Sequence, residues 1–399
     1  MAPFTFRTAG ETHGPALVTL VDGMPAGVPV RTSDIDRELA RRQVGYGRGG
    51  RMKIERDQVE LLSGIRFGQT LGGPVAMMIR NLDWPNWTKT MAQTGGRGDV
   101  PPLDTARPGH ADLSGVLKYG HDDVRNVLER ASARETAARV MAGTLARLLL
   151  EPLGVRVMGQ VLSIGKVRVP EGIAGDPARA ASSEKSELRL ADSVSEEKAR
   201  RLIDRAIRTG TSVGGVVEVI ALGVPPGLGS FVSWDRKLDA RLAHAVMSIQ
   251  AIKGVEIGDG MAGADLPGSG VHDEIFPRSR RGNPLMGGFA LPFHRKTNRA
   301  GGVEGGMSNG EPVLIRAAMK PIPTQAAPLR TIRTGDWKAV LAHKERSDVC
   351  AVPACSVVAE AMVAIVLADA FLEKFGGDSL SEIQYNYKGY LDSIFGRRP

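Results

Sequence analysis

The sequence predicts a fold of the mixed α/β class, of α+β type, in which sheets are covered by long helices. Short runs with strand character alternate along the chain with segments that carry helix start and stop signals. The chain contains no repeat of fixed period, which excludes a solenoid. The strand-like runs are bounded by turn residues and lie at 16–21, 59–62, 75–79, 155–169, 214–222 and 312–319.

The helical segments are recognised by the residues at their ends. The first, 33–42, opens with Ser33 and Asp36 in a capping-box pattern and ends with basic residues. The longest, 122–150, begins with acidic residues, contains many alanines and stops before Pro152, so we expect one helix of roughly 40 Å. Further helices are expected at 195–209, 235–250 and 355–375.

The composition is that of a soluble globular protein, with 42% apolar and 24% charged residues. The polar segment 170–197 is the best candidate for a solvated excursion, that is, a stretch that leaves the core and runs through solvent. The most apolar stretch, 357–372, carries two acidic residues and is shorter than the ~20 residues that span a bilayer. We therefore expect it to be a buried helix, and we expect no membrane role.

Cysteine usage and the N-terminus both bear on the cellular compartment. Cys350 and Cys355 are too few for a disulfide framework, and we expect both to be buried thiols in a reducing environment. The first residues lack the charged start and apolar run of a secretory signal. A cytoplasmic location follows as the expectation.

The charge balance predicts an anionic partner. The net charge is +8, which suits either a phosphorylated or carboxylated metabolite or a nucleic acid. Glycine is abundant, at 49 of 399 residues, and it gathers beside basic residues at 45–51 and 298–310. Such loops let backbone N–H groups approach an anion closely. The arginines in or beside glycine-rich or capping segments are Arg41, Arg42, Arg48, Arg51, Arg107, Arg130, Arg134 and Arg346.

Arginine holds carboxylates and phosphates by paired donors, although any single arginine is more often a surface charge. Arg130 and Arg134 are four residues apart on the expected long helix, hence on one face, with small residues between them. A flat ligand could lie close to that backbone. The alternative is a tight helix-packing surface.

Two histidines and one acid are candidates for proton transfer. His13 and His110 each lie in a probable turn beside glycine, and histidine titrates near neutrality. A structural or surface role is the alternative for each. Asp348, close to Arg346, is the only acid that stands out, and its alternative is a salt bridge to Arg346 or a helix cap. No grouping has metal-ligand spacing, so no metal is expected.

The residues alone thus indicate a soluble α/β-type enzyme that handles a small, multiply anionic substrate, and they do not name the reaction. A family resemblance does. Sequence blocks similar to those of chorismate synthases occur in the family's order at 10–14 (GETHG), 41–49, 107–112, 117–121, 129–136, 253–260, 297–302, 304–307, 318–322 and 346–353. Thr12 stands where the family usually has serine, and the hydroxyl is kept. The segments 170–197 and 262–280 resemble the family least.

The resemblance implies one domain over 1–399, a β-α-β sandwich with sheets packed around long helices, and assembly as a homotetramer. It implies the 1,4-elimination of phosphate and a ring hydrogen from 5-enolpyruvylshikimate 3-phosphate, giving chorismate in the shikimate pathway. Reduced FMN is the implied cofactor, used without net redox change. NADPH is a candidate electron source, and an external flavin reductase is the expected partner.

Residue roles are carried over from matching positions of the family blocks. His13 would protonate the departing phosphate, His110 would stabilise the reduced flavin, and Asp348 would assist removal of the hydrogen. Substrate carboxylates and phosphate would be bound by Arg48, Arg107, Arg134 and Arg346. Flavin contacts would come from Arg130, Ala131, Ser132, Gln250, Ala251, Gly305, Lys320, Pro321, Ile322, Pro323, Thr324 and Arg346. Arg42 and Arg48 lie where the family places a pyridine nucleotide.

Two other readings remain. A nucleic-acid-binding protein would interleave aromatic platforms with its basic residues, yet aromatic residues make up only 5% of the chain. A flavin-dependent enzyme of another class, acting on a small anionic substrate, would leave a net two-electron change in that substrate.

Overall fold

The computed structural model describes residues 3–49, 55–277, 291–343 and 348–395. Its first sheet has four antiparallel strands in the order β1 (Thr5–Ala9), β2 (Ala16–Asp22), β6 (Val75–Arg80) and β3 (Val59–Ser63). Its second sheet has five, in the order β10 (Ile252–Ile257), β15 (Val313–Met319), β9 (Gly215–Leu222), β7 (Arg156–Ile164) and β8 (Val167–Arg168).

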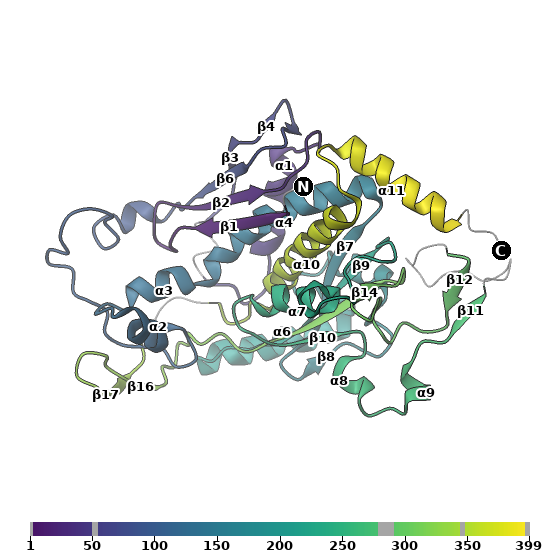
Figure 1. Cartoon of the computed structure of the whole chain (residues 1–399). Coiled ribbons are helices and arrows are strands. Elements are labelled where there is room, and N and C mark those ends of the chain that lie inside the picture. The colour runs from purple at the N-terminus through teal and green to yellow at the C-terminus, as the bar shows by residue number, and fades with distance from the viewer. Residues whose placement is uncertain (1–2, 50–54, 278–290, 344–347, 396–399) are drawn as a thin grey trace.

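Helices lie between the two sheets (Figure 1). α4 (Thr136–Leu150) contacts β1 and β2 of the first sheet, and α10 (Val352–Phe375) contacts β7 and β9 of the second. α4 and α10 also pack on one another, and α1 (Thr32–Gln43) and α7 (Leu238–Met247) contact α10 from other sides. The chain therefore has the mixed α/β architecture expected, with long helices packed between the two sheets.

The remaining helices and short hairpins lie around these layers. The helices are α2 (Asp112–Tyr119), α3 (Arg125–Ala131), α5 (Pro177–Ser183), α6 (Ser193–Thr209), α8 (Gly260–Gly263), α9 (Gly268–Val271) and α11 (Leu380–Phe395). The hairpins pair β4 (Ile65–Arg66) with β5 (Gln69–Thr70), β11 (Ile275–Pro277) with β12 (Phe293–Arg295), β13 (Val303–Glu304) with β14 (Met307–Ser308), and β16 (Arg330–Ile332) with β17 (Ala339–Leu341). Single 3-10 turns occupy Trp84–Asn86, Ala133–Glu135, Glu151–Leu153 and Trp234–Arg236.

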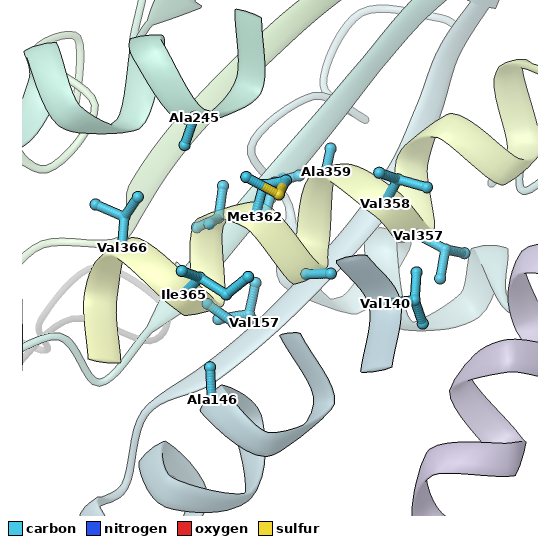
Figure 2. Packing of buried hydrophobic residues seen from close by; sticks show 14 of the residues in the cluster. Val140, Ala146, Val157, Ala245, Val357, Val358, Ala359, Met362, Ile365 and Val366 are labelled. Atoms are coloured by element: carbon cyan, nitrogen blue, oxygen red, sulfur yellow. The ribbon is translucent and has the colours of Figure 1, made fainter. Parts of the chain in front are cut away.

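α10 is the centre of the core. It is buried on nearly all sides, because α4, α7 and the second sheet surround it. Figure 2 shows Val357, Met362 and Val366 of this helix among side chains that include Val140 and Ala245. By length and composition α10 is the one described helix that could cross a membrane, but 94% of its apolar window is buried inside the protein. The expected buried helix is thus confirmed. Cys350 and Cys355 are also free and buried, as expected.

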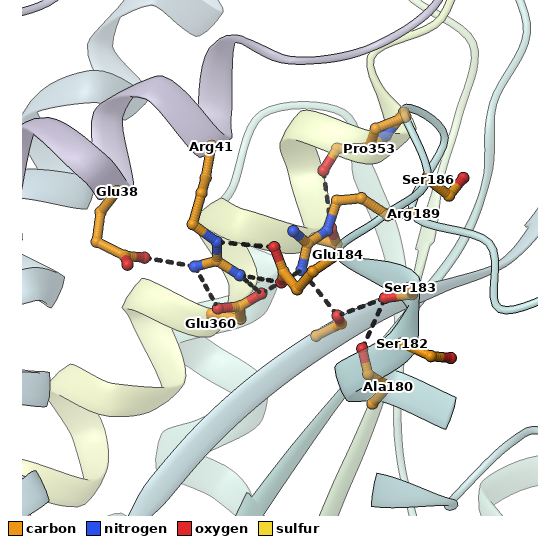
Figure 3. Close-up of polar contacts among 12 residues, drawn as sticks. Glu38, Arg41, Ala180, Ser182, Ser183, Glu184, Ser186, Arg189, Pro353 and Glu360 are labelled. Carbon is orange, nitrogen blue, oxygen red and sulfur yellow. Dashed lines mark hydrogen bonds and ion pairs between the residues drawn. The ribbon is translucent and has the colours of Figure 1, made fainter. Parts of the chain in front are cut away.

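Glu360, a buried acid of α10, is paired with three arginines, of which Figure 3 shows Arg41 and Arg189. Glu360, 1% exposed, lies 2.9 Å from Arg41, 2.9 Å from Arg147 and 2.6 Å from Arg189. Glu184 pairs with two of these arginines. Although burial raises the pKa of Glu184, its bonds to the arginines outweigh burial and lower that pKa to about 2. Arg41 is therefore part of a structural ion network.

All six strand runs form strands, with one correction: Gly165, at φ 52°, turns the chain between β7 and β8, so 155–169 is not continuous. The capping box predicted for the first helix is not formed. Ser33 lies inside α1, whose N-cap is Arg31 with no side-chain cap.

The single long helix expected at 122–150 was also wrong. Ser132 adopts an extended conformation, with φ −64° and ψ 145°, and divides the segment into α3, a 3-10 turn and α4. Its hydroxyl caps the 3-10 turn by accepting from the Arg134 backbone N–H, as serine readily does. The expected helix at 235–250 is shorter as well: a 3-10 turn precedes α7, which ends at Met247.

The solvated excursion expected at 170–197 is partly buried instead. Asp176 caps α5, and Ala180 of that helix packs on Ile220 and Leu222 of β9 and Leu314 of β15. Alternate residues of β9 face α10, so α5 covers the opposite face of the second sheet.

Candidate active site

Several of the predicted site residues lie in or beside the segment 129–136, which contains the break at Ser132. α3 ends there and α4 begins, and the loop between β1 and β2 packs against it. In that loop Gly10 has φ 105°, and a Cβ would lie 2.2 Å from the Ala16 carbonyl oxygen, so only glycine fits. The Thr12 backbone N–H and hydroxyl both donate to the Glu129 carbonyl, at 3.1 and 3.0 Å.

His13 is held by the side chain of the same glutamate. Its backbone N–H donates to Glu129 Oε2 at 2.7 Å, and its Nδ1 lies 2.7 Å from Oε1. Trp87 stacks on the imidazole with ring centroids 3.8 Å apart and planes 20° apart. The ring is thus fixed at one nitrogen and on one face.

His110 is held in a comparable way by a carboxylate. Its Nδ1 lies 2.5 Å from Asp112 Oδ1, and Arg107 donates to the same carboxylate through Nε at 2.8 Å and Nη2 at 3.1 Å. Arg107 also donates to the Thr324 hydroxyl at 3.0 Å. Burial opposes the ionised carboxyl of Asp112, but the bonds from His110 and Arg107 outweigh it and hold its pKa well below the usual range.

A buried pair of arginines shares one aspartate. Arg134 Nη1 and Arg42 Nη2 lie 2.6 and 2.9 Å from the two oxygens of Asp57. Burial and the neighbouring arginines lower the pKa of Arg42 to about 10 despite the attraction of Asp57, so its guanidinium stays charged at neutral pH. The two guanidiniums lower the pKa of Asp57 in spite of its burial. Arg134 also donates to Asn81, which in turn donates to the Gly14 carbonyl beside His13.

Asp348 pairs with Arg48, at 3.0 Å. The Gly49 backbone N–H donates to the other oxygen of Asp348 at 2.6 Å. Arg48 also contributes to lowering the pKa of Arg42, which places this pair near the Arg42–Asp57 pair. Arg346 and Arg51 lie outside the described residues.

Several residues expected at a flavin are linked to the His110 turn. Gln250 donates to Glu135 at 3.0 Å, and the Ala251 carbonyl accepts from the Lys320 backbone N–H at 2.9 Å. Lys320 Nζ reaches the Gly109 carbonyl at 2.5 Å. Ala251 has φ 68°, a conformation that favours glycine and that tends to occur at functional sites. Ser132 and Thr324, placed above, belong to the same neighbourhood, with Ala131 before the break and Pro321, Ile322 and Pro323 between Lys320 and Thr324.

Two predicted residues are placed differently. Arg130 does not share a face with Arg134, because the helix breaks between them; its side chain is exposed and donates to the Thr8 carbonyl at 2.9 Å. Gly305 lies in the turn between β13 and β14 beside the start of α7, whereas Gln250 follows the end of that helix. The structure therefore does not bring Gly305 to the other flavin candidates.

The sequence analysis did not identify the residues that contact and orient the predicted histidines and arginines. Asp112 and Glu129 lie inside the family-like blocks 107–112 and 129–136, so the adjacent histidine and arginines were an available signal. Asp57, Asn81 and Trp87 carry no such local signal, because their partners are distant in sequence.

A cavity of about 440 Å³ lies elsewhere, between α1, α4, β7 and α5. Its lining includes Arg41, Arg147 and Glu184 of the ion network and none of the predicted site residues. Since no described histidine lines this cavity, we assign the chemistry to the 129–136 neighbourhood instead. His110 lies beside the Arg107 guanidinium, and the loop that carries His13 is linked to Arg134 through Asn81, so groups that can move protons stand near groups that suit carboxylates and phosphate.

Comparisons with known proteins agree along the whole chain. A family model for chorismate synthase matches residues 4–372. The chorismate synthase of Pelobacter propionicus is 55% identical over 395 residues, covering 98% of each chain, and that of Geobacter sulfurreducens is 54% identical over 390 residues with the same coverage. That of Frankia casuarinae is 53% identical over 395 residues, covering 97% of this chain and 98% of the relative. A crystal structure of a chorismate synthase superposes with a TM-score of 0.79 at 41% identity, covering 99% of both chains.

Proposed function

The chain belongs to the chorismate synthase family, and we propose that it carries out the family's reaction with the residues around segment 129–136. The enzyme is a lyase of the shikimate pathway: it eliminates phosphate and a ring hydrogen in a 1,4 relationship from 5-enolpyruvylshikimate 3-phosphate to give chorismate. The observation that supports the assignment is that each proposed catalytic histidine is held through Nδ1 by a buried carboxylate: His13 by Glu129 of this segment, and His110 by Asp112 in a turn that Lys320 links to Ala251 and Gln250.

The arginines of this neighbourhood are the groups that would bind the substrate. We assign Arg48, Arg107 and Arg134 to the substrate's carboxylates and phosphate, together with Arg346. Each of the first three guanidiniums is oriented by an aspartate, which fixes the direction of its donors before substrate arrives. Such preorganisation favours binding of an anion in one pose. It also explains why buried arginines are tolerated here.

The two histidines and Asp348 are the groups that would transfer protons. His13 would protonate the departing phosphate, and His110 would donate to the electron-rich cofactor ring. Asp348 would assist removal of the ring hydrogen, while Arg48 and the Gly49 N–H hold its carboxylate. Imidazole suits this role because it exchanges a proton near neutral pH.

The family requires reduced flavin, and the residues here fit such a group. Gln250 Oε1 is buried without a hydrogen-bond partner among the described residues, and an N–H of a flavin ring would satisfy it. Lys320 and the exposed Arg130 supply cations for an anionic ring or phosphate. The residues assigned to FMN are those named in the sequence analysis, from Arg130 to Arg346, with the exception of Gly305. When bound, reduced flavin supplies electron density that helps phosphate leave and takes it back with the hydrogen.

The remaining assignments concern the source of electrons for the flavin, the domain organisation and the oligomeric state. Arg42 and Arg48 stay the candidates for a pyridine nucleotide, although Arg42 is 4% exposed and engaged by Asp57 and Thr136, which favours a supporting role. We therefore propose that an external flavin reductase, rather than NADPH at this chain, supplies reduced FMN. We also propose one domain over 1–399, because one buried cluster draws on both sheets, and a cytoplasmic homotetramer.

The test is anaerobic. Purified protein is mixed with chemically reduced FMN and 5-enolpyruvylshikimate 3-phosphate, and chorismate and phosphate are followed, with a parallel run on NADPH and oxidised FMN. Equal release of both products without net flavin oxidation supports the assignment. Chorismate formed in the parallel run would show that the chain can reduce FMN with NADPH and needs no external reductase. Folded protein that binds flavin and forms no product would contradict the assignment and favour a net redox enzyme.

A further inference from the structure

Glu129 is placed to control His13 through two separate contacts. Its side chain is 2% exposed, and each carboxylate oxygen has its own partner in the same residue: Oε1 lies 2.7 Å from His13 Nδ1 and Oε2 accepts from the His13 backbone N–H at 2.7 Å. One carboxylate thus fixes both the main chain and the ring of the histidine. An ionised carboxylate can only accept hydrogen bonds, so this contact keeps a proton on Nδ1.

The rest of the imidazole is constrained as well. Trp87 covers one face at a centroid distance of 3.8 Å, and its own indole N–H donates to Asp83 at 3.0 Å. His13 Nε2, in contrast, makes no hydrogen bond to any residue that the structure describes. Nε2 is therefore the nitrogen that remains for a ligand.

The loop that carries His13 is also anchored by hydrogen bonds that do not involve the Glu129 carboxylate. Thr12 donates twice to the Glu129 carbonyl, and Asn81 donates to the Glu11 and Gly14 carbonyls at 3.1 and 2.8 Å. These four bonds anchor the loop on both sides of His13. A change confined to the Glu129 carboxylate should then alter the ring and leave the loop in place.

We infer that Glu129 is a positioning residue that keeps the His13 proton on Nδ1 and presents Nε2 to the substrate. The inference rests on the proposed function, because His13 is the residue assigned to the departing phosphate. His13 acts as the imidazolium: its second proton passes from Nε2 to the phosphate oxygen as the C–O bond to phosphate breaks, and the ring keeps the other proton on Nδ1, in the hydrogen bond to Glu129. Glu129 takes up no proton in this transfer. Asp112 likewise contacts His110 Nδ1, but there Arg107 Nη2 also lies 3.1 Å from the same nitrogen.

The test exchanges the carboxylate for an amide in Glu129→Gln. The amide oxygen has to accept from the His13 backbone N–H, so its NH₂ group faces Nδ1 and forces the neutral ring to carry its proton on Nε2. Ring nitrogen shifts of ¹⁵N-histidine-labelled protein, recorded up to about pH 9, distinguish the two tautomers. A His13→Gln protein assigns the signals.

The expected result has three parts. Wild-type His13 carries the proton on Nδ1; Glu129→Gln moves it to Nε2; and kcat falls on the order of 10²–10⁴-fold with little change in KM, since an acid with the wrong tautomer loses that much. Glu60→Gln, which removes a glutamate from an exposed pair with Arg80, is the control for charge and should retain wild-type kcat.

Three outcomes would overturn the inference: a wild-type proton on Nε2, an unchanged tautomer in Glu129→Gln, or an unchanged kcat in that variant. The first is read from the wild-type protein, with His13→Gln needed only for assignment, so a folding defect in Glu129→Gln cannot obscure it. Failure of the proposed function looks different, because wild-type protein would then form no chorismate while the nitrogen shifts still report on Glu129.

Discussion

Gly143 of α4 faces Ala361 of α10 so closely that a Cβ at position 143 would lie 2.3 Å from the Ala361 Cβ. Gly143→Ala should therefore destabilise the protein by roughly 1–3 kcal/mol through overpacking, although alanine is the better helix former. Urea unfolding measures the change. Gly389→Ala in α11 is the matched control: a Cβ there meets nothing within 4 Å, and a gain of up to ~1 kcal/mol is expected. Equal effects of the two changes would mean that the helices are not in close contact.

The ion network around Glu360 makes a second prediction. Glu360→Gln leaves Arg41, Arg147 and Arg189 around a neutral amide, and removing one partner of a buried network costs about 3–5 kcal/mol. Glu60→Gln removes an equal charge from an exposed pair and should change stability by less than ~1 kcal/mol. Comparable losses in the two variants, by urea unfolding, would show that Glu360 is not buried among these arginines.

The contrast between local and distant interactions explains how far the sequence could predict this fold. The strands were found because their alternating residues and turn boundaries are local signals, and α10 because its apolar run is continuous. The break at Ser132 was missed because alanine-rich sequence favours a helix, while contacts from residues more than 110 positions away hold the end of α3.

The same distinction applies to the site. His13, His110 and the arginines stand beside glycines or in family-like blocks, so they were identified. Asp57 could not be, since Arg134 is 77 residues further along the chain and no local pattern joins them. The i, i+4 spacing of Arg130 and Arg134 misled the interpretation because it assumed a continuous helix.

Asp57 predicts how stability depends on pH. Arg42 and Arg134 lower its pKa in the folded protein despite burial, whereas in the unfolded chain it returns to about 3.9. The unfolded state then binds a proton first, so the stabilisation is present above pH ~5 and is lost as pH falls through about 4 and below. Asp57→Asn should be less stable at neutral pH and should lose less on acidification. Thermal unfolding between pH 3 and 7 tests this, and parallel curves for the two proteins would contradict it.

Asp348 makes the sharpest prediction for activity. Asp348→Asn keeps an oxygen that can accept from the Gly49 N–H but removes the charge that pairs with Arg48, so folding should be intact while kcat falls ~10²–10⁴-fold. Asp122→Asn breaks an exposed aspartate–arginine pair with Arg97 and serves as the control. If both variants turn over 5-enolpyruvylshikimate 3-phosphate at the wild-type rate, Asp348 has no part in proton transfer. If Asp348→Asn instead raises KM and leaves kcat unchanged, its role is to orient Arg48 for substrate binding.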